Sequence, residues 1–195
     1  MTHPEAPRGR PRDSRAHRAI LTATAELLTE AGYAATSIGA VAARAGTGKD
    51  TIYRRWSGKP ELVYEAVFTA TESAPVPDTG SLAGDLTALV EALIQEFTAP
   101  AAAAALPGLL ADFAATPGLQ TRIRDRFLAP AKDGLTEVFE RAAGRGETRG
   151  AVPVDLVLDT LAGAVLFHVG LVGAPAGPEL APRLAGLIGR GIEVR

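Results

Sequence analysis

The sequence predicts an all-α protein of about nine helices, and three observations carry this prediction. Apolar residues recur three and four positions apart in most segments, which is the period of a helix with one buried face. Glycines and prolines fall at the ends of these segments, where helices stop and start. No segment alternates apolar and polar residues as a half-buried strand does, and no internal repeat is found.

The N-terminal segment, residues 1–13, is predicted to be a flexible basic arm. Three prolines among its first eleven residues disfavour a helix. Ser14 is a suitable N-cap for the first helix. Apolar residues then keep helical spacing from Ile20 to Ala31, and Gly32 is expected to end this helix.

Two short helices are expected next, over residues 36–45 and 49–56. Thr36 or Ser37 can cap the earlier helix, because a side-chain oxygen there accepts a hydrogen bond from a free backbone N–H group. Gly46 is expected to end it, and a short turn leads to the later helix.

The spacing of Ala42, Gly46 and Ile52 is typical of a helix-turn-helix. The two helices cross closely, so a small side chain is needed at Ala42, and the turn needs the positive φ that Gly46 tolerates. Ile52 then fills the wedge between the helices. The second helix is left to enter a DNA major groove. This pattern predicts a DNA-binding domain over residues 14–59.

The remainder, residues 60–195, is predicted to form a second helical domain. Pro60 suits the first turn of a fourth helix, and the segment 73–80 is a natural break. The apolar run 161–177 contains His168 and is interpreted as a buried helix, since it barely reaches the length of a membrane span. The further helices are expected over 82–97, 101–115, 117–143 with a break at Pro130, 153–172 and 178–192.

The charge is unevenly distributed along the chain. The formal net charge is −2, yet residues 1–65 carry a surplus of three cations and residues 66–195 a surplus of five anions. A basic front half suggests that this part meets a polyanion, although a solvated basic tail would give the same count. Cysteine is absent, which excludes disulfides and thiolate metal sites.

The motif residues resemble the DNA-binding domain of the tetracycline-repressor (TetR) family of bacterial transcription regulators. The resemblance covers roughly residues 14–65, and Thr47 departs from it where the family has an apolar residue. The runs 126–130 (RFLAP) and 140–147 (ERAAGRGE) are similar to one family subgroup. The residues that carry the main resemblance are Gly32-Tyr33, Thr36 to Ile38, Val41-Ala42, Ala45-Gly46, Lys49 to Trp56 and Gly58 to Leu62.

The resemblance implies a homodimeric repressor that binds double-stranded operator DNA. It places Lys49, Thr51 and Arg54 on the outward face of the recognition helix, where Arg54 can pair with guanine and Thr51 can meet a thymine methyl group. Phosphate contacts are implied for Tyr53, Arg55, Lys59 and the helix N-terminus at Thr36. Trp56 is expected in the core, and the ring of Tyr53 could pack there too.

The arm carries a second candidate contact, through Arg8, Arg10 and Arg12. An extended Arg-Gly-Arg-Pro run fits a narrow minor groove, whose negative potential attracts arginine. The alternative is a tail that only adds solubility. Deciding between them requires a binding measurement.

The second domain is expected to dimerise through residues 153–192 and to hold an unknown small-molecule effector. Dimerisation follows because one helix-turn-helix reads too few base pairs; an intramolecular core is the alternative. Each candidate pocket residue could equally be core. The candidates are Leu93, Phe97, Leu110, Phe113, Phe127, Phe167 and His168.

Other classes of protein find no support in the sequence. No nucleophile motif, phosphate loop or metal-ligand spacing is present, so we expect no enzyme, no cofactor and no metal. No apolar stretch follows the N-terminal arginines as in a signal peptide, and the acidic second half does not suit a membrane surface, so a cytoplasmic protein is predicted. A DNA-binding protein without an effector remains the alternative.

Deleting residues 1–12 should weaken operator binding and flatten its salt dependence, because fewer counterions are released when fewer arginines meet the phosphates. Fluorescence anisotropy with a labelled operator at several salt concentrations measures both quantities. Unchanged affinity at fixed salt would show that the arm does not contact DNA.

Overall fold

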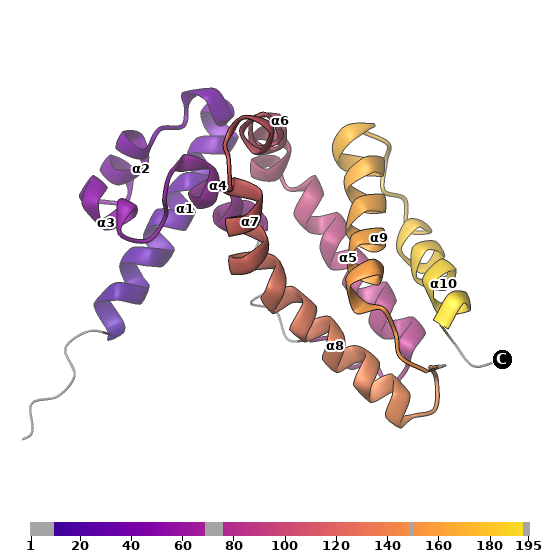
Figure 1. Cartoon of the computed structure of the whole chain (residues 1–195). Helices are drawn as coiled ribbons and strands as arrows, with labels where there is room; N and C mark the ends of the chain where they lie inside the picture. The colour runs from indigo at the N-terminus through magenta and orange to yellow at the C-terminus, as the bar shows by residue number, and fades with distance from the viewer. Residues whose placement is uncertain (1–9, 69–75, 149, 193–195) are drawn as a thin grey trace, which may run out of the picture.

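The computed structural model describes residues 10–68, 76–148 and 150–192, and within these ranges every regular element is a helix. Ten α-helices and two π-helical segments are present, and no β-strand occurs in the described part of the chain. This confirms the all-α prediction. The count is higher than the expected nine because the segment 117–143 divides into more than one element. Figure 1 shows α1 to α3 on one side and α5, α8, α9 and α10 on the other.

The first helix, α1 (Arg10–Ala35), begins four residues before Ser14, so the expectation that Ser14 caps it is wrong. Proline in the first turn of a helix loses no hydrogen bond, because the N–H groups there have no helical partner, and Pro11 lies in that turn. The backbone of Arg10 and Arg12 is therefore helical, while their side chains and all of Arg8 lie outside the described residues. The helix breaks at Gly32 (φ 78°), as predicted.

Ser37 caps α2 (Ile38–Arg44), and Thr36 does not. The hydroxyl of Ser37 accepts a hydrogen bond from the N–H group of Ala40 at 3.1 Å. Thr36 is buried and its hydroxyl donates to the carbonyl of Gly32 at 2.9 Å. Its hydroxyl therefore bonds to the end of α1, so Thr36 does not cap α2, and the predicted phosphate contact at Thr36 stays a prediction.

Gly46 ends α2 in the left-handed conformation (φ 63°) that the sequence predicts. Its N–H group donates to Ala43, and the next N–H, of Thr47, reaches back to Ala42 at 2.9 Å. These two bonds satisfy carbonyls that the end of a helix otherwise leaves free. The chain thereby turns directly into α3 (Lys49–Tyr53), which is shorter than the expected 49–56.

A small apolar core holds the helix-turn-helix together. Ala42 and Ile52 are buried against each other's helices as their spacing predicts, and Trp56 is 1% exposed, which confirms its place in the core. Leu62 of the next helix, α4 (Lys59–Phe68), belongs to the same core. The other members are Ile20, Ala23 and Val41.

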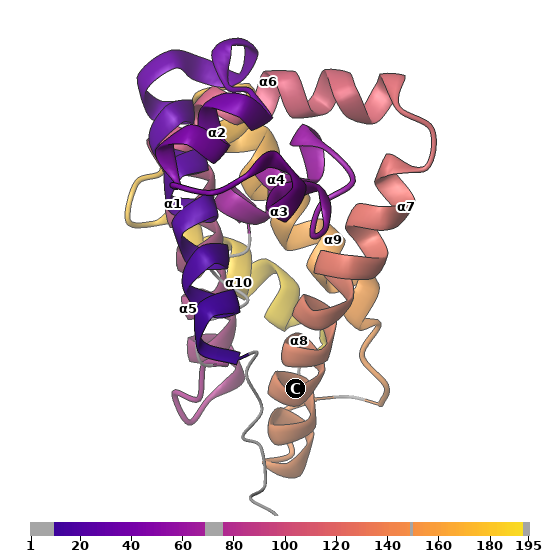
Figure 2. The ribbon, with the colours of Figure 1, turned by 90° about the vertical axis from the view of Figure 1, so that its left-hand side faces the viewer.

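The second half of the chain forms a helical bundle around α5 (Leu82–Thr98), seen behind the helix-turn-helix in Figure 2. Its buried core joins α5, α8, α9 and α10, while α1, α4 and α6 share a separate core at the junction between the two halves. The remaining elements are α6 (Pro100–Ala115), α7 (Leu119–Ile123), η2 (Arg124–Leu128), α8 (Ala129–Gly144), α9 (Val154–Val165), η3 (Leu166–Leu171) and α10 (Leu180–Ile192).

The π-helical segment η2 lies directly before Pro130. Proline has no N–H group to bond the preceding turn, and a widened turn accommodates this loss without ending the helix. The predicted break at Pro130 is therefore a local widening within one rod of α7, η2 and α8 (Figure 1).

The segment Val154–Leu171 is long and apolar enough to cross a membrane by length and composition, but core helices of other proteins pass the same test. Only 17% of it is buried within the chain. The expectation of a buried helix is therefore wrong for much of this run: Phe167, Leu171 and Val172 are all more than half exposed.

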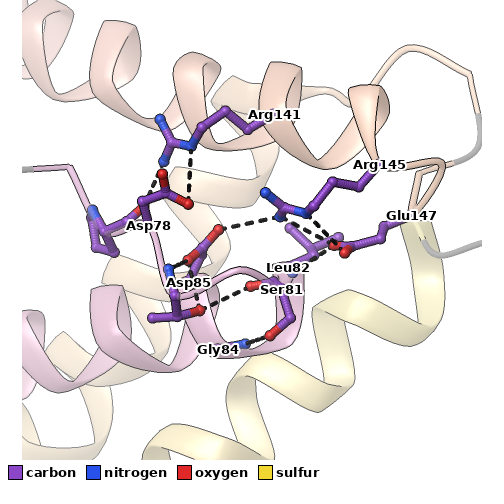
Figure 3. A network of polar contacts seen from close by, with 10 residues as sticks. Asp78, Ser81, Leu82, Gly84, Asp85, Arg141, Arg145 and Glu147 are labelled. Atoms are coloured by element: carbon purple, nitrogen blue, oxygen red, sulfur yellow. Dashed lines mark hydrogen bonds and ion pairs between the residues drawn. The ribbon is translucent and has the colours of Figure 1, made fainter.

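A polar network fixes the start of α5 to the end of α8 (Figure 3). The carboxylate of Asp85, which is fully buried, accepts hydrogen bonds from the N–H group and the hydroxyl of Thr79 at 2.6 and 2.8 Å. Arg145 contacts Asp85 at 3.4 Å and Glu147 at 2.9 Å, and Glu147 in turn accepts the N–H group of Leu82 at 2.6 Å.

Replacing Asp85 by alanine should lower the free energy of unfolding by about 2–4 kcal/mol, because it leaves the two Thr79 donors without their buried acceptor and removes one of the two carboxylates that pair with Arg145. Urea unfolding followed by circular dichroism measures the loss. The exposed Asp78, 3.8 Å from Arg141, is the matched control, and its replacement by alanine should cost less than about 1 kcal/mol. Equal losses for the two variants would contradict this account of the network.

Candidate nucleic-acid interface and internal cavity

The helix α3 turns one face to solvent and one face to the core. Ile52 is fully buried, while Lys49 and Arg54 are exposed and Thr51 is half-buried. The three residues predicted to read bases are thus accessible from outside. Tyr53 is 55% exposed, so its ring is not part of the core and its hydroxyl is open to a partner.

Lys59, at the start of α4, is turned toward the junction between the two halves. Its Nζ donates a hydrogen bond to the carbonyl of Tyr33 at 2.6 Å and lies 3.9 Å from the centre of the Tyr33 ring. Burial lowers the pKa of Lys59, while the nearby Asp112 carboxylate acts in the opposite direction. Its ammonium group is therefore engaged by α1 in this conformation, which the sequence pattern did not predict.

Tyr33 connects this point to α6. Its hydroxyl donates a very short hydrogen bond to Asp112, and its ring lies against Gly108 so closely that a Cβ atom at Gly108 would meet ring atoms at 2.0 Å. Burial and the contact with Asp112 raise the pKa of Tyr33. A glycine at position 108 is thus required for α1 and α6 to approach each other.

An arginine from η2 contacts the end of the recognition segment. Nη1 of Arg126 donates to the carbonyl of Arg55 at 2.5 Å, and Nη2 lies 3.2 Å from Glu65 of α4. Glu65 also accepts the indole N–H of Trp56 at 2.6 Å and pairs with His17 at 3.0 Å. This guanidinium joins the second half of the chain to the segment directly after α3.

Glu61 completes the junction beside this arginine. Its carboxylate accepts the N–H group and the hydroxyl of Ser57 at 2.9 and 2.7 Å, and Arg122 of α7 at 2.8 Å. Burial pushes the pKa of Glu61 up, but these hydrogen bonds outweigh it, so that the pKa lies below its ordinary value. The contribution of these Glu61 contacts to the stability of the folded protein is therefore complete above the ordinary carboxyl pKa. It is lost as the pH falls through the lowered pKa of Glu61.

A cavity of about 280 Å³ lies within the second half of the chain. Its walls come from α4, α5, α9 and the rod of η2 and α8, together with Val76 and Pro77 of the segment before α5. This volume is close to the lower end of the range for small-molecule sites. The lining residues include Tyr64, Phe68, Leu93, Glu96, Phe97, Leu135 and Asp159.

The structure does not bring the predicted pocket residues together in this cavity. Leu93 and Phe97 line it, whereas Phe113 and Phe127 pack on the ring of Tyr64 without lining it. The other three lie elsewhere: Leu110 and Phe167 are exposed, and His168 lines a surface depression beside α10.

Sequence reasoning missed Tyr64, Phe68, Glu96 and Asp159 as lining residues. Tyr64 and Phe68 fall at helical spacing on α4, a pattern that core residues share, and nothing distinguishes Glu96 from a surface carboxylate in the sequence. No group of three or more metal-ligating side chains occurs within the described ranges.

A helix-turn-helix with an exposed recognition helix lies on one side of the chain, and a helical domain with a cavity lies on the other. This arrangement defines a helix-turn-helix transcription regulator, and comparison with known proteins specifies its family. Residues 20–66 match the family described as bacterial regulatory proteins, tetR family, and residues 76–188 match the tetracyclin repressor-like C-terminal domain. The chain belongs to the TetR family of transcriptional regulators.

Individual relatives agree with this assignment. The chain is 31% identical to the HTH-type transcriptional regulator YdeS of Bacillus subtilis over 87% of its own length and 85% of the relative's. It is 33% identical to the DNA-binding transcriptional repressor TetR of Mycobacteroides abscessus over 85% and 87% of the two chains. The crystal structure of the TetR family regulator SCO0332 superposes with a TM-score of 0.74 at 25% identity, covering 91% of this chain and 98% of that one.

Replacing Arg54 by alanine should weaken binding to the cognate operator by about 1–3 kcal/mol and relax specificity at one base position, because an exposed guanidinium at the C-cap of α3 can pair with guanine. Binding to a library of operator variants measures both effects. Arg124, which is 60% exposed in η2, provides a matched control for the loss of one positive charge. An equal loss for every operator sequence would instead identify Arg54 as a phosphate contact.

Proposed function

We propose that this protein is a homodimeric repressor that a small-molecule effector releases from its operator. The observation that carries the proposal is the cavity of about 280 Å³, which opens against α4, the helix that also packs on the helix-turn-helix. A filled second domain would favour an effector-independent DNA-binding protein. The cavity therefore supports the inducible regulator over this alternative.

The helix α4 connects the cavity to the helix-turn-helix. Tyr64 and Phe68 line the cavity, while Leu62 on the same short helix belongs to the core beneath α3. A ligand that moves these two rings also moves Leu62, and with it the recognition helix. Such a ligand releases DNA only if it binds the DNA-incompetent state more tightly than the competent one.

A second route runs through the rod of η2 and α8. Leu128 lines the cavity two residues after Arg126, whose guanidinium contacts the carbonyl of Arg55 behind α3. π-Helical turns are often found where a helix adjusts for function. A shift of this rod on ligand binding would displace the backbone that supports Arg54 and Arg55.

The dimer is proposed to form through residues 153–192. Large apolar side chains are exposed along α9, η3 and α10, and soluble monomers rarely show such a surface without a partner. Two-fold symmetry would place two recognition helices on one operator. The exposed residues are Leu156, Phe167, Leu171, Val172 and Leu187.

We assign the reading of base edges to Lys49, Thr51 and Arg54 and phosphate contacts to Tyr53 and Arg55. This assignment is supported by the exposure of Tyr53 and by the partial exposure of Arg55 next to α3. Lys59 could bind phosphate only after leaving Tyr33. We place the protein in the cytoplasm, where its DNA partner lies, and expect no membrane contact.

Footprinting on the protein's own upstream region, with and without candidate ligands, tests release. Protection that no ligand abolishes would favour the effector-independent alternative.

Light scattering tests the dimer. Replacing the exposed Leu187 by glutamate should give a monomer that binds the operator at least about tenfold more weakly, because a charge then enters the apolar interface. A wild-type monomer at micromolar concentration would refute the dimer.

A further inference from the structure

The cavity between α4, α5, α8 and α9 has an unusual charge. Two carboxylates line it, Glu96 from α5 and Asp159 from α9, and no lysine, arginine or histidine is among the described residues of its walls. Glu96 is 9% exposed, so water screens its charge only weakly. The described walls therefore form an apolar space that offers acidic groups and no basic ones.

The lysine beside the cavity wall on α8 is engaged elsewhere. Lys132 neighbours the lining residue Ala131 on α8, but its ammonium group pairs with Asp155 at 2.5 Å, one turn before Asp159. Asp159 itself makes no hydrogen bond or ion pair with the described residues and stands exposed at the edge of the cavity. Its charge is thus available to a ligand.

Aromatic rings supply the rest of the recognition surface. Tyr64, Phe68 and Phe97 line the same cavity, with 5.4 Å between the ring centres of Tyr64 and Phe68 and 5.3 Å between those of Phe68 and Phe97. Ring faces attract cations, and their edges and the leucines of α5 and α8 accept an apolar body.

We propose that this cavity binds an organic cation: a molecule with an apolar or aromatic body of modest size and an ammonium or similar positive group. The positive group lies against the rings and the carboxylate of Glu96, and Asp159 attracts it at the edge. An anionic ligand is disfavoured, because both carboxylates repel it. The inference rests on the proposed function, in which this cavity is the effector site.

A pair of probes of the same shape and opposite charge tests the chemistry. Benzyltrimethylammonium and phenylmethanesulfonate both carry a tetrahedral head group on a benzyl body, and neopentylbenzene is the neutral counterpart. Isothermal titration of the full-length protein should give at least about tenfold tighter binding for the cation than for either of the others. This comparison needs no variant, so it holds even where a substitution disturbs folding.

Two variants locate the charge that matters. Glu96→Gln should weaken binding of benzyltrimethylammonium by about tenfold or more and leave the neutral probe unchanged, whereas Asp159→Asn should weaken it by about two- to fivefold, because this carboxylate is exposed to water. Glu91→Gln is the matched control, since Glu91 lies exposed on the same helix and does not line the cavity. Thermal unfolding checks that each variant is folded.

The outcomes separate this inference from the proposed function. Equal or tighter binding of the anionic or neutral probe, or no binding of the cation, overturns the inference and leaves release of DNA by another class of ligand open to the footprint. Cation binding that depends on Glu96 supports the inference. If the bound cation leaves the operator complex intact, the site stands and release by this ligand class fails.

Discussion

The packing of one short helix, α4, is the constraint on which the rest of the structure depends. Leu62 lies in the core of the helix-turn-helix, Val63 and Val67 lie in the core shared with α1 and α6, and Tyr64 and Phe68 line the cavity. The ten residues of α4 therefore contact two separate cores and the cavity, each on a different side of the helix. Because close-packed cores deform little, α4 cannot shift against one neighbour without moving the others.

Ion pairs reinforce the apolar packing of α4 and depend on the orientation of their partners. Arg122 and Arg126 reach from α7 and η2 to the carboxylates of Glu61 and Glu65, which are mostly withdrawn from water. Partly buried pairs of this kind depend on geometry, since a small displacement leaves a charge without its partner. The junction thus favours discrete arrangements of the helix-turn-helix over a continuous range, which agrees with the proposed release of DNA by a ligand.

The elements that the sequence predicted well are those whose determinants are local. Gly32 breaks the first helix as expected and Gly46 adopts the positive φ expected of it, while the small Ala42 and the buried Ile52 pack as their spacing requires. The sequence places the start of α1 too late, because Pro11 suggests an end to helical structure although it fits the first turn of a helix. The sequence leaves open whether Thr36 or Ser37 caps α2, and the structure selects Ser37.

The sequence by itself determined the family of this protein, its helical class and the face of α3 that meets solvent, because each follows from residue types at short fixed spacings. Only the tertiary structure decided the cavity, since its walls come from four elements far apart in the chain and its carboxylates, Glu96 and Asp159, resemble surface residues in the sequence. It also decided that Lys59 faces Tyr33 and that Arg126 supports Arg55. Contacts between distant segments depend on how whole helices pack, and no local pattern encodes that packing.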